Sequence, residues 1–319
     1  RRPNSATRAT MASAVVARSV APAVAPAAGP RARRGSRLRA RTGQERAKAV
    51  AAGRSSGDTG DDAGTAARVP VLGAAEVHAR LAERVHPKAR DTYAAFYSSW
   101  AGCITTDPAA MVVPFDDHMV HRGHGVFDTA HVCDGRCHLL DRHLARFERS
   151  MRAAKLKPPA GQSQASMRAV ILATIAASGL RDAQVRYYAG AGPGGFALSH
   201  DECVDSTFYV TVVAGRAAPD PNKGVAVVTS DVPIKPPEFA TVKSVNYLPN
   251  AMVVADARER GADYGVWMTE RGLVGEGPSM NLAIVEDGCL VTPPTDDVLA
   301  GCTVRRAMEL IEPMGRDGA

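Results

Sequence analysis

Apolar residues recur at helical spacing in three stretches of the chain. Helices are predicted over residues 74–85 and 167–178, where the apolar positions repeat every three to four residues. A third predicted helix carries an apolar stripe made of Leu140, Leu144, Phe147 and Met151. Each of these helices therefore has a face that can pack against another layer of structure.

Strands are predicted where β-branched and aromatic residues concentrate, over residues 184–192 and 207–215. Residues 126–140 contain two apolar runs on either side of Asp134 and Gly135. Because Asp-Gly is favoured in the tight turns that join antiparallel strands, this segment is predicted to be a β-hairpin. These strands and the helices around them predict a small α+β domain.

The C-terminal part has a different pattern, because short apolar runs follow one another with few predicted helices between them. A helix is predicted over 247–261 and another from about Thr303. The short strands are predicted over 224–230, 264–270, 273–276, 281–287 and 289–294, with a further one in the N-terminal half at 111–115. Such a series of short strands joined by turns favours a barrel-like domain.

Charge is distributed unevenly along the chain. The formal net charge is +6, but residues 1–57 alone carry +12, from twelve Arg and one Lys against the single acid Glu45, which leaves −6 for the rest. This segment is rich in Ala, Arg, Ser and Pro and nearly free of acids and aromatics, as organelle transit peptides are. A basic arm that binds nucleic acid is the weaker reading, because no aromatic residues interleave with the arginines.

These patterns divide the chain into four segments. Residues 1–57 are predicted to be a disordered transit-like segment, and residues 58–92 a Gly/Ser/Asp-rich linker followed by the first helix. Residues 93–216 form the small α+β domain, and residues 217–319 form the barrel-like domain. The first Met is Met11, so the residues before it are expected to be upstream read-through.

Several classes of protein are disfavoured by the sequence. No apolar run approaches the roughly 18 residues needed to span a bilayer, so we expect a soluble mature protein. Six cysteines are scattered without the density of a disulfide framework, and we expect free thiols. We expect no metal site at His131, Cys133, Cys137 and His138, because strand alternation sends neighbouring side chains of a hairpin to opposite faces.

Four short fragments carry the chemistry. They are DRHLAR at 141–146, VKSVNYL at 242–248, VGEGPSMN at 274–281 and LAGCT at 299–303. In this order and spacing the chain, from about Tyr93 onward, resembles the fold type IV pyridoxal-phosphate enzymes, also called class IV aminotransferases. It is most similar to the plastid members described as aminodeoxychorismate lyases or D-amino-acid transaminases. The resemblance implies a two-domain α+β fold, with pyridoxal 5'-phosphate between a small N-terminal domain and a barrel-like C-terminal domain.

The resemblance assigns the two residues that activate the cofactor. Lys243 matches the catalytic lysine, which bonds to the cofactor and later transfers a proton. It lies among Val242, Val245 and Tyr247, where burial is expected to lower its pKa. Glu276 matches the carboxylate that faces the pyridine nitrogen and keeps the ring protonated.

The phosphate and the ring are assigned to a second group. Arg146 matches the arginine that binds the cofactor phosphate, for which its planar guanidinium is suited. Cys302 and Thr303 match the segment whose N–H groups and hydroxyl bind the same phosphate at a helix start. Leu299 corresponds to the residue that packs against the pyridine ring.

The substrate side departs from part of the family. Phe127 stands where D-amino-acid transaminases have a tyrosine, and Phe127 with Thr129 forms the Phe-x-Thr pattern of the lyases, so Thr129 is a candidate proton relay. The loop 190–196 lacks the Arg and His that bind the substrate carboxylate in bacterial D-transaminases. Arg186 is a nearby candidate for that role.

The resemblance therefore predicts an aminodeoxychorismate lyase, which forms 4-aminobenzoate and pyruvate for folate synthesis, with D-amino-acid transaminase activity as a second reaction. The alternatives are a transaminase of D-alanine or branched-chain amino acids, or a non-catalytic remnant. Relatives continue past the position of Ala319, which suggests an incomplete C-terminus. The expected partners are a small amino substrate and a second subunit in a homodimer, with neither nucleic acid nor membrane. The expected location is the plastid.

Overall fold

The computed structural model describes residues 69–159, 161–215 and 222–316, and every structural statement below concerns these residues. All the elements of the fold lie within the unit Pro70–Ala319. The N-terminal elements are α2 (Ala74–Arg84), α3 (Pro87–Thr92), β1 (Tyr93–Ser98), β2 (Cys103–Thr105), η1 (Pro108–Ala110), α4 (His118–His121), β3 (Gly125–Cys133), β4 (Arg136–Cys137), α5 (Leu140–Ala153), α6 (Gln164–Ser178), β5 (Ala183–Gly190), η2 (His200–Glu202) and β6 (Thr207–Ala214).

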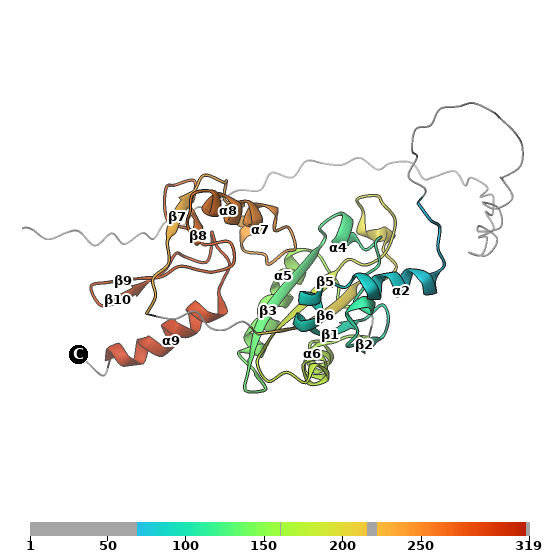
Figure 1. Ribbon diagram of the computed structural model, residues 1–319. Helices are drawn as coiled ribbons and strands as arrows, with labels where there is room; N and C mark the ends of the chain where they lie inside the picture. Colours follow the sequence, from blue (N-terminus) through green and yellow to red (C-terminus); the bar gives the residue numbers. More distant parts are fainter. Residues whose placement is uncertain (1–68, 160, 216–221, 317–319) are drawn as a thin grey trace, which may run out of the picture. The chain divides into compact units, whose positions relative to one another are not determined.

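The N-terminal strands form one six-stranded antiparallel sheet (Figure 1). Its strand order is β2-β1-β6-β5-β3-β4. The pairing of β3 with β5 places Phe127 opposite Tyr188 and Thr129 opposite Arg186. This register puts the candidate substrate residues side by side on one face of the sheet.

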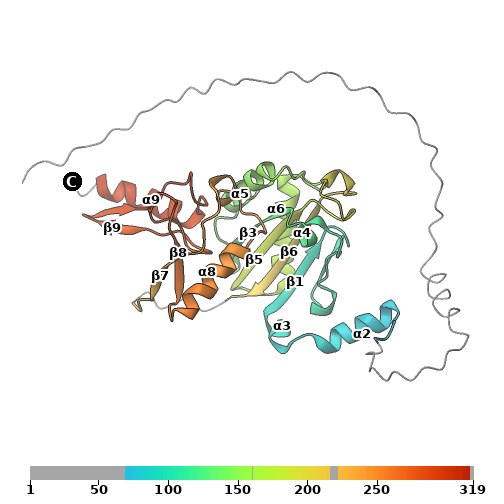
Figure 2. The same cartoon turned by 90° about the horizontal axis from the view of Figure 1, so that it is seen from above.

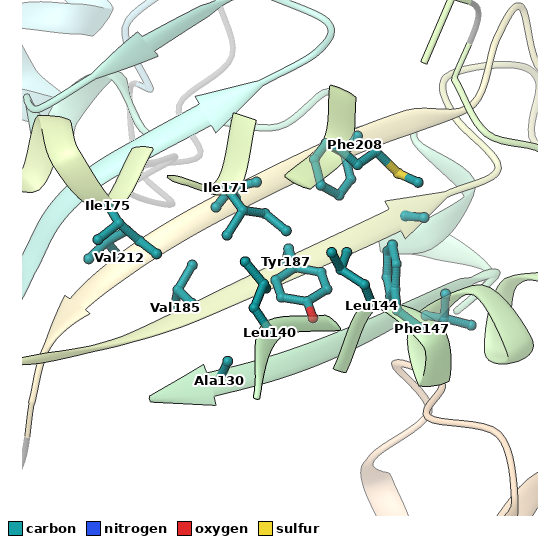
Figure 3. Close-up of a cluster of buried hydrophobic side chains, with 14 of the residues drawn as sticks. Ala130, Leu140, Leu144, Phe147, Ile171, Ile175, Val185, Tyr187, Phe208 and Val212 are labelled. Atoms are coloured by element: carbon teal, nitrogen blue, oxygen red, sulfur yellow. The ribbon is translucent and has the colours of Figure 1, made fainter. Parts of the chain in front are cut away.

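The hydrophobic core lies between the other face of this sheet and the helices α5 and α6 (Figure 2). In β3 the residues Val126, Ala130 and Val132 point into this core, because successive side chains of a strand alternate between faces. Figure 3 shows Phe147 of α5 and Ile171 of α6 packed with side chains of the central strands. The apolar stripe of α5 thus anchors the helix that also carries Arg146 against the sheet.

The C-terminal elements are β7 (Val227–Ser230), α7 (Pro237–Ala240), α8 (Leu248–Glu259), β8 (Tyr264–Trp267), β9 (Ile284–Glu286), β10 (Cys289–Val291) and α9 (Cys302–Arg316). Strands β7 and β8 are parallel, with α7 and α8 in the connection between them, and β9 pairs with β10 in an antiparallel hairpin. Helix α8 packs closely on β8, since a Cβ on Gly265 would lie 2.6 Å from a side-chain carbon of Val253. The fold is α+β, as predicted.

Most of the predicted helices and strands are confirmed, including the hairpin around Asp134 and Gly135. Two predicted strands are wrong. Residues 111–115 form no strand, and Pro114 within this stretch cannot donate a ladder hydrogen bond. Residues 273–276 contribute only an isolated bridge to Met268. The predicted transit segment 1–57 lies outside the described residues, and the domain boundary at 216/217 stays a prediction.

Candidate active site

The candidate catalytic lysine is held against the start of β3. The Phe127 backbone N–H donates to the Lys243 carbonyl (2.9 Å), and the Val245 N–H donates to the Gly125 carbonyl (3.0 Å). A third bond fixes the lysine itself, because its own N–H donates to the Ser150 hydroxyl of α5 (3.1 Å). These bonds place the side chain of Lys243 beside Phe127.

The Lys243 ammonium lies in an aromatic environment. Its Nζ donates to the Tyr247 hydroxyl (3.0 Å) and lies 4.6 Å from the centre of the Phe127 ring. Burial, together with the nearby Arg146 charge, lowers the pKa of Lys243 to about 8. Roughly a tenth of the side chain is therefore neutral amine near pH 7, which a nucleophilic role requires. Burial raises the pKa of Tyr247 to about 12, so its hydroxyl stays protonated.

Glu276 is a buried carboxylate on the segment that returns alongside the end of β8, where its carbonyl accepts a hydrogen bond from the Trp267 N–H (3.0 Å). Its Oε2 accepts a hydrogen bond from the Leu299 N–H (3.1 Å), and the Asn281 side-chain amide lies 3.5 Å from the same oxygen. The Asn281 amide also donates to the Leu299 carbonyl (2.8 Å). Burial raises the pKa of Glu276, although the Leu299 hydrogen bond and the charges of Lys235 and Lys243 oppose that rise. The structure thus brings together Glu276 and Leu299, which the sequence placed at one site.

Arg146 belongs to a buried network of charged groups. Its Nε and Nη2 donate to the two Asp128 carboxylate oxygens (2.8 and 2.7 Å), and its Nη1 donates to the Ala300 carbonyl (3.3 Å). His143 Nδ1 donates to the same carboxylate of Asp128 (2.8 Å). Such bidentate pairing fixes the orientation of a guanidinium.

The network keeps all three groups charged. Burial favours the neutral form of Asp128, but hydrogen bonds from Arg146 and His143 outweigh it and lower the pKa of this carboxyl. Burial likewise opposes the charge on His143, yet the hydrogen bonds to Asp128 and Cys302 raise its pKa to about 9. The cluster therefore provides a buried positive region beside α9.

Cys302 and Thr303 begin α9, as predicted. Cys302 is buried, and Thr303 is exposed. The preceding Gly301 has no room for a side chain, because a Cβ there would lie 1.7 Å from Asn281 Oδ1. The start of this 15-residue helix thus lies against the loop that carries Asn281 and Glu276, with the N–H groups of its first turn free of helix partners.

The two candidate substrate residues lie on the open face of the sheet. The Phe127 ring stacks on Tyr188 (5.6 Å between centroids) and meets Tyr247 edge-on (5.0 Å). Thr129 lies two residues further along the same face, opposite Arg186. Its backbone N–H donates to Asp128 (2.7 Å), and in the described part of the chain its hydroxyl makes no hydrogen bond. The hydroxyl is thus available to a substrate.

Four groups at this site were not assigned from the sequence: Asp128, His143, Lys235 and Tyr247. The position of Asp128 could have been used as a signal, because an acid on the apolar face of a predicted strand needs a buried partner of opposite charge. His143 and Arg146 gave another, since a spacing of three places them on one face of α5. Lys235 gave none, as its position over the Tyr247 and Trp267 rings (5.2 and 5.9 Å) depends on tertiary packing.

The described residues also bear on the metal and membrane expectations. Within them, no cluster of three or more His, Cys, Asp or Glu side chains has the arrangement of a metal site. No helix in the same ranges is long and apolar enough to cross a bilayer.

Comparisons with known proteins show the family of the chain. The family described as amino-transferase class IV matches residues 125–317. The chloroplastic D-amino-acid transaminase of Arabidopsis thaliana is 47% identical over 78% of this chain and 66% of its own length. The bifunctional aminodeoxychorismate lyase / D-amino acid transaminase of Mycobacterium tuberculosis is 30% identical over 66% of this chain and 76% of its own length.

A solved structure is similar to this chain in fold and sequence. The PLP-bound form of a hypothetical aminotransferase from Mycobacterium tuberculosis has a TM-score of 0.57 and 28% identity, over 70% of this chain and 79% of that one. The fold and site define a fold type IV pyridoxal-phosphate protein, and the chain belongs to the class IV aminotransferase family. It spans about two thirds of the length of the first curated relatives that it matches, 66% and 65%.

The residues present fit the family's cofactor, pyridoxal phosphate. Lys243 supplies an amine of lowered pKa, and Glu276 a buried carboxylate with one oxygen engaged by the protein. Arg146 and the start of α9 supply a cation and backbone N–H groups for a phosphate. Amine, carboxylate and phosphate site are thus all provided by one unit of the chain.

Proposed function

We propose that this protein is a pyridoxal-phosphate enzyme whose main reaction is that of an aminodeoxychorismate lyase, with D-amino-acid transamination as a second reaction. The observation that carries the proposal is the half-buried Lys243, whose amine faces Tyr247 and Phe127 while Glu276 lies within electrostatic reach. When bound, pyridoxal phosphate supplies an electron sink for the negative charge that develops on the substrate.

Each residue of the site has a role in this proposal. Lys243 would hold the cofactor through its amine, and as a neutral amine it would accept or donate a proton at the substrate. Glu276 holds a proton at the pyridine nitrogen. Arg146 and the first N–H groups of α9, at Cys302 and Thr303, bind the phosphate, and Leu299 packs against the ring.

The lyase reaction is favoured by the open face of the sheet. Phe127 has no hydroxyl to hold a substrate carboxylate, and residues 190–196 contain neither Arg nor His. Thr129 lies two residues from Phe127 on the same strand, and its hydroxyl, which makes no hydrogen bond within the described ranges, can relay a proton. The two relatives described above are both named for D-amino-acid transamination, and the one from Mycobacterium tuberculosis for the lyase reaction as well.

Arg186 is the residue that we assign to the substrate carboxylates. It lines an open cavity of about 710 Å³, together with Tyr188, Gln184 and Thr211. Among the described residues its guanidinium makes no hydrogen bond or ion pair, and Tyr188 joins the cavity to the Phe127 ring. A planar, unpaired guanidinium binds a carboxylate in bidentate fashion.

The direct test is pyruvate release from aminodeoxychorismate without any keto-acid acceptor. We expect release by the wild-type chain and a loss of about 10²-fold or more in Thr129→Val, with a smaller loss of D-alanine transamination. Thr229→Val, a strand threonine in β7, is the matched control and should leave both rates unchanged. If Thr129→Val lowers both activities equally, Thr129 is structural. If the wild-type chain releases no pyruvate, the lyase proposal is wrong.

We also propose a homodimer, since a cluster of apolar side chains is exposed around α4. It consists of Val112, Val113, Phe115, Phe196 and Leu198, and the two Phe rings lie 5.9 Å apart. Contiguous apolar surface of this kind marks interfaces. Light scattering should give the mass of a dimer for the wild-type chain and of a monomer for Phe196→Asp. A monomeric wild-type chain would refute this.

For location we propose the plastid, on the composition of residues 1–57 and on the chloroplastic relative. A reporter that carries residues 1–57 should enter plastids. Retention of that reporter in the cytosol would refute the assignment.

A further inference from the structure

A row of three polar side chains crosses the open face of the six-stranded sheet. The strand register sets Thr129 of β3 opposite Arg186 of β5, and Arg186 opposite Thr211 of β6. Residues that are directly paired across two strands point to the same face, with their Cβ atoms about 5 Å apart. The Arg186 side chain therefore has a threonine hydroxyl on each side of it.

The members of this row have no partners of their own. Within the described ranges, the Arg186 guanidinium and the hydroxyls of Thr129 and Thr211 make no hydrogen bond or ion pair. Arg186 and Thr211 both line the open cavity of about 710 Å³. Arg186 is the only charged residue among those that line it, and none of them is acidic. A cation and a free hydroxyl side by side in a cavity without acids suit an anionic ligand.

The rest of the lining suits a ring. The cavity is bounded on its other sides by the apolar or aromatic side chains of Tyr93, Phe96 and Met111. Tyr188 also lines it and stacks on the Phe127 ring, with 5.6 Å between the centroids. A flat unsaturated ring can extend such a stack. The cavity volume, about 710 Å³, is that of a site for a ligand much larger than alanine.

The row also reaches away from the reacting amine. Lys243 is held beside Phe127 on β3, whereas Thr211 lies on β6, the second strand from β3 in the sheet order. Neighbouring strands are about 4.8 Å apart, so β6 lies roughly 10 Å from β3. In D-alanine the amine and the carboxylate are on the same carbon, and a molecule so short cannot contact both Lys243 and Thr211. A substrate with a ring between its amine and a carboxylate has the required length.

We propose that Thr211 is a specificity-determining residue, which together with Arg186 binds the second carboxylate of a ring-containing dicarboxylate substrate. This inference rests on the proposed function, which places the substrate amine at Lys243 and a substrate carboxylate at Arg186. A guanidinium has five N–H donors and one carboxylate engages two of them, so donors remain for a second carboxylate. The Thr211 hydroxyl adds a further donor to that second carboxylate. An amine with a single carboxylate has no group at this position.

Ligand binding tests the proposal without turnover. The full chain, loaded with pyridoxal phosphate, is titrated in a calorimeter with isophthalate, which has two carboxylates on one ring, and with benzoate, which has one. Neither compound has an amine that could react with the cofactor. Wild type should bind isophthalate at least tenfold more tightly than benzoate. Equal affinities of wild type for the two compounds, or no binding of isophthalate, would overturn the proposal.

Variants at Thr211 then assign the difference to its hydroxyl. Thr211→Val keeps the shape of the side chain and should weaken isophthalate binding about tenfold, because a hydrogen bond to a charged group is lost. Its affinity for benzoate should stay within about twofold of wild type. An unchanged affinity for isophthalate, or an equal loss for both compounds, would show that Thr211 does not select the second carboxylate.

Two further variants separate the hydroxyl from an effect on the fold. Thr211→Ser retains the hydroxyl and should bind isophthalate within about twofold of wild type. Thr229→Val, on β7, is the matched control and should leave both affinities unchanged. A loss in Thr211→Ser as large as that in Thr211→Val would overturn the assignment to the hydroxyl.

The failure of this inference can be told apart from the failure of the proposed function. A wild-type chain that releases no pyruvate from aminodeoxychorismate would refute the lyase reaction, while the titrations still decide whether the site selects a dicarboxylate. If the cofactor does not bind, the same titrations of the cofactor-free chain decide it. Pyruvate release together with equal affinities for isophthalate and benzoate would overturn the role of Thr211 and leave the lyase reaction standing.

Discussion

The buried network of Asp128, His143 and Arg146 makes the stability of the fold depend on pH. The pKa of His143 rises from 6.5 to about 9 in the folded chain. A group whose pKa is raised by folding stabilises the fold fully below its unfolded pKa, and this contribution is lost as the pH rises through its folded pKa. The stabilisation from His143 is therefore complete below about pH 6.5 and disappears between about pH 6.5 and about pH 9.

The size of this effect follows from the shift. At 1.36 kcal/mol per unit, it corresponds to about 3 kcal/mol, with little loss to solvent because the His143 side chain is 11% exposed. Asp128→Asn removes the carboxylate charge, the larger of the two contributions, from Asp128 and Cys302, that raise the pKa of His143. The pKa of the Cys302 thiol is lowered in the folded chain, so its contribution to stability changes with pH in the direction opposite to that of His143. The wild-type and Asp128→Asn chains are therefore compared with each other at each pH. The difference in unfolding free energy between wild type and Asp128→Asn should be larger at about pH 6.5 than at about pH 9.5, by up to about 3 kcal/mol.

Urea unfolding at each pH, with the same cofactor load in all samples, measures this difference. Asp134→Asn is the control, because the Asp134 carboxylate is 88% exposed and its pairing with Arg181 is weak. That variant should differ from wild type by less than about 0.5 kcal/mol at every pH. A difference between wild type and Asp128→Asn that does not change with pH would show that Asp128 does not keep His143 charged.

Two further predictions concern the other parts of the site. Glu276→Gln keeps the acceptor for the Leu299 N–H but loses the charge, so it should lower kcat about 10²-fold or more with the cofactor still bound. Near-normal turnover of this variant would show that Glu276 does not belong to the site. Gly301→Ala places a Cβ 1.7 Å from Asn281 Oδ1 and should weaken cofactor binding at least tenfold in an absorbance titration. Gly224 has open space around it, so Gly224→Ala should leave the cofactor affinity unchanged. Equal cofactor affinities of the two variants would refute the packing argument.

Much of the fold was predictable because local patterns and tertiary packing agree. The stripe on α5 and the Asp134-Gly135 turn each specify one structure, and both are confirmed. Residues 111–115 were predicted wrongly, because apolar content alone favours a strand and gives no information about a pairing partner.

The site was predictable only in part, for a related reason. Lys243, Glu276 and Arg146 occur in short fragments that resemble a known family. The carboxylate that pairs with Arg146 belongs to Asp128, 18 residues away on another element, and only the spacing of His143 and Arg146 on one face of α5 hinted that they share it. Tyr247 was visible only as an apolar neighbour of Lys243, because the direction of its hydroxyl depends on how α8 begins. Contacts between elements, and the pKa values they set, are not encoded in local spacing.

The central claim is that Lys243 is the residue that bonds to pyridoxal phosphate. The most direct measurement is borohydride reduction of the loaded chain, followed by digestion and peptide mass spectrometry. The account predicts that the reduced cofactor is attached to Lys243, and that Lys243→Ala retains none. Attachment to Lys235, whose amine lies over the same Tyr247 ring, or to any other lysine would contradict it.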